Sequence, residues 1–284
     1  MLTDLKTICA QADEQNICVG AFNVVSLTAL HAVLDAAEEL KLPVILQFAQ
    51  IHENFCSLED IGPAMVRQAE KASVPVCVHV DHGADTDYIR MGLDMGFTGA
   101  MFDGSTLPYR QNVEISASVA ELAHSYGAGA EAELGSMGIR EDGTGSGASS
   151  EKVYTDPDLA ADFVRQTGVD LLACSFGTAH GIYLKAPKLD MNIITAVREK
   201  TGGIPVVMHG GSGVPDDQLR ECIRAGVRKI NYFTYLEKAG AAAIRPYFAP
   251  DAANQYPIYC DISLAAAEGM RENAKSAMLT FALR

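Results

Sequence analysis

A histidine and a glycine-rich turn directly follow a short apolar run near residue 205. The run 205–208 is typical of a buried strand in a parallel sheet. His209 comes next, followed by Gly210, Gly211 and Ser212, ahead of a predicted helix start at Val214. Glycine lets the backbone approach a ligand closely, and the N–H groups at a helix start suit a phosphate. The pattern therefore predicts a metal ligand beside a phosphate site, with a glycine-rich turn and an incidental histidine as the alternative.

Polar side chains also follow most of the other apolar runs. Asp81 and His82 end one run, and His180 follows another. Together with His209, these histidines offer three imidazole groups, the ligand pattern of a catalytic zinc with an open fourth position. They are far apart in the sequence, so the prediction depends on a fold that brings strand ends together. The other polar residues in such positions are Asn23, Asp103, Glu133, Asn231 and Thr234.

Asp81 and His82 are neighbours and are therefore expected to point to opposite sides of their strand. One would hold a metal ion while the other faces substrate or packs behind it; an aspartate that only bonds a neighbouring loop is the alternative. His79, within the same strand, is predicted to be a hydrogen-bonded core residue, and His52 to lie in the loop after the second strand. Glu141, in a loop rich in Gly and Ser, would be a solvated acid unless the loop delivers it to substrate as a base.

The elements that must position these residues follow a repeated order of strand, turn and helix. The helices are expected at 27–40, 57–71, 85–95 and 111–126, with one starting near 155 and a mostly helical segment after 235. Eight alternations predict an α/β fold of the (β/α)8 TIM-barrel type, with a doubly wound sheet as the alternative. Residues 1–284 read as a single domain with a C-terminal helical extension. The predicted strands are 19–25, 43–50, 75–81, 99–103, 130–134, 171–176, 205–208 and 229–233.

Composition excludes several classes of partner. Acidic residues outnumber basic ones 36 to 22, which argues against a nucleic-acid partner because phosphate backbones need basic surfaces. No apolar run approaches the ~20 residues that span a bilayer, and the first residues lack a signal-peptide pattern. The seven cysteines are odd in number and form no Cys-x-x-Cys pair. They predict a reduced, cytoplasmic protein that is not associated with a membrane.

The sequence contains six short motifs: 80–83 (VDHG), 102–105 (FDGS), 131–135 (EAELG), 177–183 (GTAHGIY), 209–213 (HGGSG) and 229–231 (KIN). Together they resemble those of the class II, zinc-dependent ketose-bisphosphate aldolases. The resemblance runs from about residue 2 to residue 240. It implies a TIM barrel, a zinc ion and reversible cleavage of a phosphorylated ketose to dihydroxyacetone phosphate and an aldehyde such as glyceraldehyde 3-phosphate. It also implies a role in carbohydrate metabolism such as glycolysis, and a homodimer or homotetramer.

The resemblance also assigns roles to individual residues. His82, His180 and His209 would bind zinc, with Glu133 and Asp103 as further acids at the metal. Asp81 would exchange a proton with the hydroxyl on carbon 4 of the sugar, and Glu141 would remove the proton from dihydroxyacetone phosphate. Breaking the bond between carbons 3 and 4 needs a Schiff-base lysine or a metal Lewis acid, and no lysine lies at the end of strand six. The predicted substrate-binding residues are Asn23, Gly181, Lys185, Gly210, Gly211, Ser212, Asn231 and Thr234.

Two positions depart from the family pattern. Ala49 stands where a substrate-contacting serine is common, and Phe233 stands where many fructose-bisphosphate aldolases carry an aspartate. Lys185 is closer to the tagatose-bisphosphate branch. These residues favour tagatose over fructose 1,6-bisphosphate, with an aldolase for another ketose 1-phosphate, a non-catalytic metal- and phosphate-binding barrel and a zinc hydrolase as alternatives. The sequence leaves open another divalent ion in place of zinc, and the need for a monovalent cation.

Overall fold

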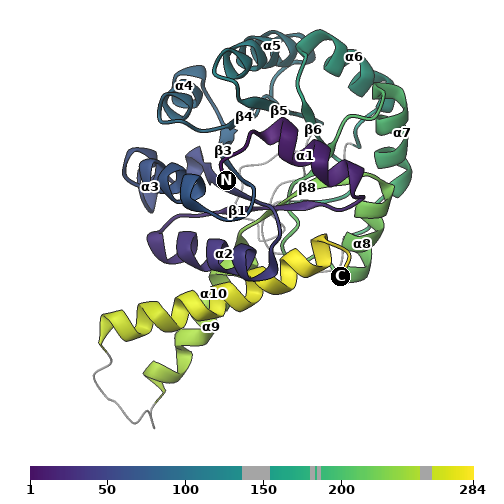
Figure 1. Cartoon of the computed structure of the whole chain (residues 1–284). Helices are drawn as coiled ribbons and strands as arrows, with labels where there is room; N and C mark the ends of the chain where they lie inside the picture. The colour runs from purple at the N-terminus through teal and green to yellow at the C-terminus, as the bar shows by residue number, and fades with distance from the viewer. Residues whose placement is uncertain (136–153, 180–182, 184–186, 250–257) are drawn as a thin grey trace.

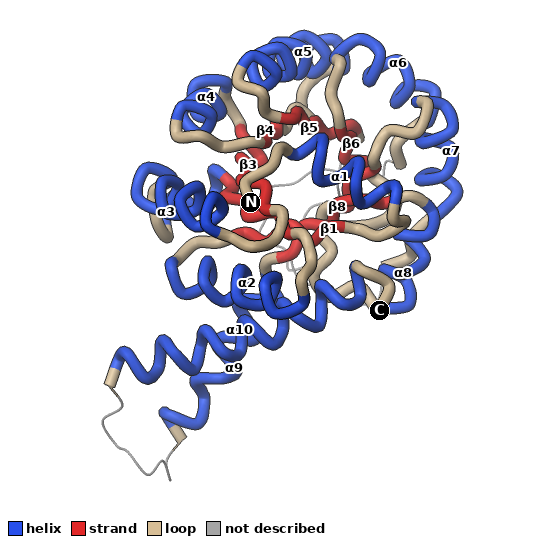
Figure 2. Tube along the Cα trace, viewed as in Figure 1, coloured by secondary structure: helices blue, strands red, loops and turns tan. Residues whose placement is uncertain are grey.

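The eight strands form a closed parallel barrel in chain order, from β1 to β8 and back to β1 (Figures 1 and 2). The computed structural model describes residues 1–135, 154–179, 183, 187–249 and 258–284. This topology confirms the predicted TIM barrel and excludes the doubly wound sheet, because closure leaves no sheet edge. The strands are β1 Val19–Asn23, β2 Val44–Ala49, β3 Val76–Gly83, β4 Gly99–Phe102, β5 Gly129–Leu134, β6 Leu171–Cys174, β7 Val206–Met208 and β8 Val227–Tyr232.

Helices surround the barrel and alternate with its strands, as the ring of blue tubes around the red strands shows (Figure 2). Ser57 accepts a hydrogen bond from the N–H of Asp60 and so caps α3, as the capping-box pattern predicted. The helices are α1 Leu5–Glu14, α2 Leu27–Leu40, α3 Leu58–Lys71, α4 Thr86–Asp94, α5 Tyr109–Ser125, α6 Pro157–Thr167, α7 Met191–Thr201, α8 Asp216–Ala225, α9 Thr234–Ile244 and α10 Tyr259–Phe281, with short 3-10 turns η1 Gln50–Asn54 and η2 Arg245–Phe248.

Helix α1 closes the end of the barrel where the strands begin (Figure 1). Its buried face packs on side chains inside the barrel, including Ala21, Ile45 and Val207. The N–H of Leu5 donates to the carbonyl of Thr98, immediately before β4. The opposite end, where the strands finish, is the end at which barrels of this type carry their functional sites.

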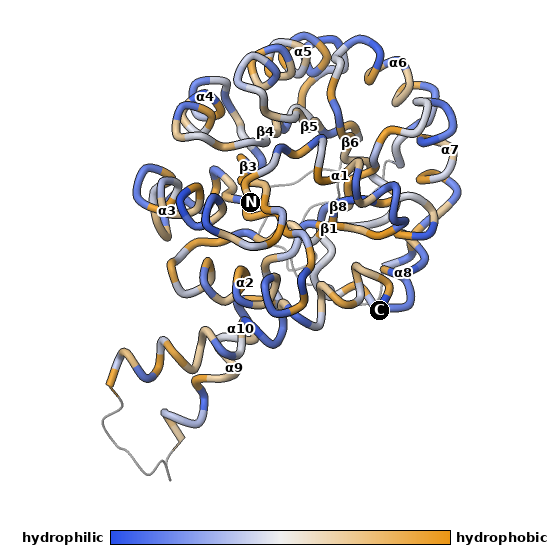
Figure 3. The backbone as a smooth tube through the Cα atoms, viewed as in Figure 1, coloured by the Kyte–Doolittle hydropathy of each residue, from blue (hydrophilic) through white to orange (hydrophobic). Residues whose placement is uncertain are grey.

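Helices α9 and α10 pair and extend away from the barrel, while the later part of α10 lies against α2 (Figure 1). This pair is the predicted C-terminal helical extension. Apolar residues are spread along it (Figure 3), and Phe248, Tyr259 and Leu264 are exposed. Among the described residues, no helix has both the length and the apolarity needed to cross a membrane.

Candidate active site

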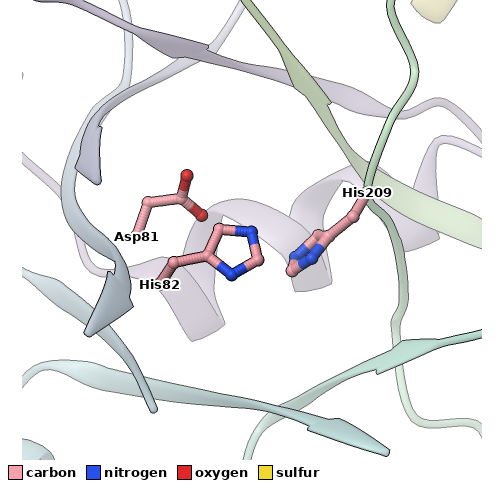
Figure 4. Close-up of side chains that lie close together, drawn as sticks. All are labelled: Asp81, His82 and His209. Carbon is pink, nitrogen blue, oxygen red and sulfur yellow. The ribbon is translucent and has the colours of Figure 1, made fainter. Parts of the chain in front are cut away.

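Asp81, His82 and His209 converge at the end of the barrel where the strands finish. Their ligand atoms all lie within 4.8 Å of one another. Asp81 and His82 belong to β3, and His209 directly follows β7 (Figure 4). The rings of His82 and His209 meet edge to face, with centroids 4.5 Å apart. Two predicted zinc ligands and the predicted proton-exchanging acid are thus brought together from distant parts of the chain.

The backbone of β3 is irregular at His82. The register with β4 shifts between Val80 and Gly83, and His82 has a φ of 45° in the left-handed region. A bulge of this kind adds a residue to one strand and redirects its side chains. As a result, Asp81 and His82 both reach the same cluster, so the strict alternation expected from the sequence does not hold here. Such strain at a non-glycine residue is typical of functional sites.

Asp103 holds the ring of His82. Its Oδ2 lies 2.8 Å from Nδ1 of His82, and its Oδ1 accepts from the N–H and hydroxyl of Ser105. Burial alone would raise the pKa of Asp103, but its contacts with His82 and Ser105 hold the pKa well below the usual range. Nε2 of His82 is therefore the nitrogen that would face a metal ion. His82, Asp103 and Glu133 also form a second group with ligand atoms within 4.8 Å of one another.

His209 is buried between two carboxylates. Its Nε2 lies 3.0 Å from Oε1 of Glu131, and its Nδ1 lies 3.1 Å from Oε2 of Glu133. Burial alone would lower the pKa of His209, but the hydrogen bonds and charges of the two glutamates outweigh it and raise the pKa to about 10. A metal ion bound at Nδ1 would replace the proton on that nitrogen, while Glu131 would hold Nε2. Imidazoles with adjacent carboxylates are a donor set that fits zinc.

Asp81 is buried and held by three amide side chains. Oδ2 accepts from Asn23 at 2.8 Å and from Gln47 at 3.2 Å, and Oδ1 accepts from Asn231 at 3.0 Å. Burial alone would raise the pKa of Asp81, but the nearby positive charges, those of His82 and Lys229 foremost, outweigh it and hold the pKa well below the usual range. The carboxylate is thus ionised and able to accept a proton.

The glycine-rich turn after β7 is tightly packed. Gly210 has a φ of 68°, and a Cβ there would meet the carbonyl oxygen of Ala179 at 2.1 Å. The hydroxyl of Tyr183 donates to the carbonyl of Gly210 at 2.9 Å and accepts from the N–H of Ala179 at 2.8 Å. Ser212 accepts from the N–H of Phe233, which precedes α9. The glycines therefore allow the loops after β6, β7 and β8 to meet at the mouth of the barrel.

Two more predicted substrate-binding residues are Gly211, which lies in this turn, and Thr234, which lies at the start of α9. Gly211 donates its N–H to the carbonyl of Asn231 at 3.2 Å, and a Cβ at Gly211 would meet Ile230 at 2.3 Å. Thr234 is the first residue of α9 and is partly exposed. Four further predicted site residues lie outside the described residues: Glu141, His180, Gly181 and Lys185.

Aromatic rings lie beside Asp81 at the mouth. The rings of His52 and Phe233 contact each other, with centroids 4.4 Å apart and planes tilted by 36°. Ala49 pairs with Asp81 in the register between β2 and β3, so its methyl group shares the site's side of the sheet. Burial lowers the pKa of His52, although the charge of Asp81 opposes this shift. A neutral imidazole, a phenyl ring and a methyl group thus line this part of the mouth.

Sequence reasoning gave no role to Gln47, Glu131 or Lys229. The alternation of strand residues could have identified two of them. It puts Glu131 on the inner face of the barrel together with Glu133, and Lys229 there together with Asn231. His79 is buried as predicted, but neither ring nitrogen makes a hydrogen bond with a described residue, and Nε2 lies 3.5 Å from Glu131. Burial, foremost, and the charge of Lys229 lower the pKa of His79 to about 4. The site therefore extends one layer deeper into the barrel than predicted.

The comparisons with known proteins all find aldolases. The profile of the family described as "Fructose-bisphosphate aldolase class-II" matches residues 3–283. The crystal structure of the YdjI aldolase from Escherichia coli K12 is 32% identical, with a TM-score of 0.87 over 99% of this chain and 97% of that one. A putative fructose-1,6-biphosphate aldolase from Coccidioides immitis is 22% identical, with a TM-score of 0.86 over 98% and 95%. Fructose-bisphosphate aldolase (Fba) from Campylobacter jejuni is 22% identical, with a TM-score of 0.80 over 99% and 95%.

Proposed function

Because the chain belongs to the class II fructose-bisphosphate aldolase family, we propose that it cleaves a phosphorylated ketose reversibly, with bound zinc, to dihydroxyacetone phosphate and an aldehyde. The family match confirms the resemblance seen in the motifs, and the protein is an enzyme of the carbon–carbon lyase class. The convergence of Asp81, His82 and His209 is the observation that carries the proposal.

His82 and His209 would hold the zinc ion, with His180 as the third imidazole and Glu133 and Asp103 as adjacent acids. Zinc, or another divalent ion in its place, would supply Lewis-acid polarisation of the ketone. The orientation of these two imidazoles supports this assignment, because Asp103 holds Nδ1 of His82 and Glu131 holds Nε2 of His209. Adding a monovalent cation to the assay tests whether turnover also requires one.

Asp81 would take the proton from the hydroxyl on carbon 4 as the bond between carbons 3 and 4 breaks. Its ionised carboxylate suits this role, and the three amides that hold it leave no freedom to turn away. Glu141, which follows β5 in the sequence, would exchange the second proton with dihydroxyacetone phosphate. The two acids would thus act on opposite sides of the bond that breaks.

Tagatose 1,6-bisphosphate is the proposed first substrate and fructose 1,6-bisphosphate the second. Asn23 would line the substrate. The residues that would hold the phosphate or line its pocket are Gly181, Lys185, Gly210, Gly211, Ser212, Asn231 and Thr234. A ketose 1-phosphate that releases an uncharged aldehyde is a second candidate. The contacting rings of His52 and Phe233 and the methyl group of Ala49 favour it, because they present apolar surface beside Asp81.

We further propose a homodimer or homotetramer that works in cytoplasmic carbohydrate metabolism such as glycolysis. Exposed apolar side chains on the α9–α10 extension, including Tyr259 and Leu264, support self-association because such patches commonly mark interfaces. All seven cysteines are free thiols, which fits a reducing compartment.

A coupled assay for dihydroxyacetone phosphate tests the substrate assignment. The substrates are tagatose and fructose 1,6-bisphosphates and the matching ketose 1-phosphates. The highest kcat/KM on a bisphosphate supports the first candidate, and the highest kcat/KM on a 1-phosphate supports the second. Zinc-loaded protein that releases dihydroxyacetone phosphate from none of the four would overturn both and favour a non-catalytic barrel.

A further inference from the structure

Lys229 is a fully buried cation in the middle of β8, one layer below the mouth of the barrel. Its Nζ lies 2.9 Å from Oε2 of Glu131 and donates to Oδ1 of Asn231 at 2.7 Å. A lysine ammonium has donors only, so both partners must turn an oxygen towards it. One buried charge thus fixes two side chains on different strands.

The contact between Lys229 and Glu131 affects His209, a proposed metal ligand. With Oε2 of Glu131 held by Lys229, Oε1 lies 3.0 Å from Nε2 of His209. A carboxylate that pairs with an ammonium at one oxygen presents its other oxygen as an acceptor, so Oε1 selects the form of His209 that carries its proton on Nε2. Nδ1 is then the nitrogen for a metal.

The contact between Lys229 and Asn231 affects Asp81, the proposed proton-exchanging acid. With Oδ1 of Asn231 facing Lys229, its Nδ2 faces Asp81 and donates to Oδ1 at 3.0 Å. The amide has no other orientation that satisfies both neighbours, because lysine cannot accept and a carboxylate cannot donate. Lys229 therefore determines which atom of Asn231 meets Asp81.

We propose that Lys229 is a positioning residue that orients His209 through Glu131 and Asp81 through Asn231, so that one cation couples metal binding to proton exchange. The inference rests on the proposed function. Lys229 has no place in the reaction itself, because Asn231 lies between it and Asp81. Partners behind metal ligands commonly contribute 10–100-fold to metal affinity or activity.

Three variants test this, with zinc affinity measured by chelator competition alongside kcat, KM and thermal stability. Lys229→Met keeps the length of the side chain and removes the charge, and it should lower zinc affinity and kcat by about 10–100-fold each. Lys229→Met with Glu131→Gln avoids the unpaired buried carboxylate that destabilises the single variant. It should fold more stably than the single variant, yet keep the loss of kcat, because Asn231 is still not oriented. Glu131→Gln alone should lower zinc affinity while its kcat at saturating zinc stays above that of the double variant.

Arg228→Met is the matched control. Arg228 is the next residue along β8, is also buried and pairs with Asp13, but it lies on the opposite face of the strand. This variant should lose stability and keep its zinc affinity and kcat.

A purely structural role for Lys229 predicts a different pattern. Full zinc affinity and kcat in the stable double variant, or equal losses in Arg228→Met, would overturn the inference. The zinc-affinity measurements need no turnover. A lack of aldolase activity in the unmodified protein would therefore count against the proposed function, and unchanged zinc affinity in the variants would count against the role of Lys229.

Discussion

Nδ1 of His82 lies 2.8 Å from Oδ2 of Asp103, although the two residues come from the ends of different strands. The contact depends on the bulge in β3, which places His82 in the left-handed region and turns its ring towards β4. His209 has an equivalent partner in Glu131. Each of these two imidazoles is thus oriented by a carboxylate, as is common for histidines that bind a metal.

Replacing Asp103 with asparagine should weaken zinc binding. The amide keeps the size of the side chain and can still accept from Ser105, but it loses the charge that holds His82. We expect about tenfold lower zinc affinity by chelator competition and a smaller change in kcat at saturating zinc. Asp35→Asn, on the exposed face of α2, is the control. Unchanged zinc affinity in Asp103→Asn would show that Asp103 does not orient the ligand.

Gly210→Ala should destabilise the protein more than Gly168→Ala. Both glycines have a φ of 68°, but a Cβ at Gly168 meets nothing within 4 Å, whereas one at Gly210 meets the carbonyl of Ala179. Gly168→Ala therefore measures the cost of the left-handed backbone alone, about 1–2 kcal/mol. We expect a further ~1–3 kcal/mol of lost unfolding free energy from the clash at Gly210, measured by denaturant unfolding. Equal losses would mean that the loops near Gly210 move apart freely.

Phe233→Asp should shift substrate preference. The change removes the ring that contacts His52 and adds a hydrogen-bond acceptor beside the sugar. One such hydrogen bond to a charged group contributes about 1.5 kcal/mol, or roughly tenfold in kcat/KM. We expect the ratio of kcat/KM for fructose bisphosphate to that for tagatose bisphosphate to rise by about this factor. Phe55→Ala, at an exposed ring that also contacts His52, is the control and should leave the ratio unchanged.

Much of the fold and part of the site follow from the sequence alone. The eight strands are visible as short apolar runs, and α2 has the predicted bounds. Helix α1 was not predicted, although Leu5, Ile8, Cys9 and Ala12 have the spacing of a helical face. Helix α7 was also missed, because it buries only Ile194 and Val197 and so has little apolar periodicity.

The sequence predicted those site residues that can be recognised from their type and their position after a strand. The histidines and Asp81 stand out because they follow strands, whereas the pairing of Lys229 with Glu131 depends on a contact across the barrel. The sequence contains no local signal for such a contact, because it arises from the register of eight strands. The bulge that turns His82 towards Asp103 is hidden for the same reason.

Asp170 should make stability depend on pH. Burial alone would raise its pKa, but hydrogen bonds from the N–H of Ala130, from His124 and from Lys6 outweigh it and lower the pKa. The ionised group therefore stabilises the fold above the pKa that it has when unfolded, near 3.9, and this contribution is lost as the pH falls through the lower folded pKa. Denaturant unfolding of Asp170→Asn should show lower stability than the unmodified protein at pH 6 and a shrinking difference towards pH 3. A difference that grows towards pH 3 would contradict this assignment.

Titrating zinc into metal-free protein tests most directly whether it is a zinc-dependent aldolase. Release of dihydroxyacetone phosphate from tagatose and fructose bisphosphates is followed during the titration. We predict no release in chelator and full release at one zinc per chain. Asp81→Asn should bind zinc equally well and release dihydroxyacetone phosphate about 10²–10⁴-fold more slowly. Release that persists in chelator, or full activity in Asp81→Asn, would contradict the account.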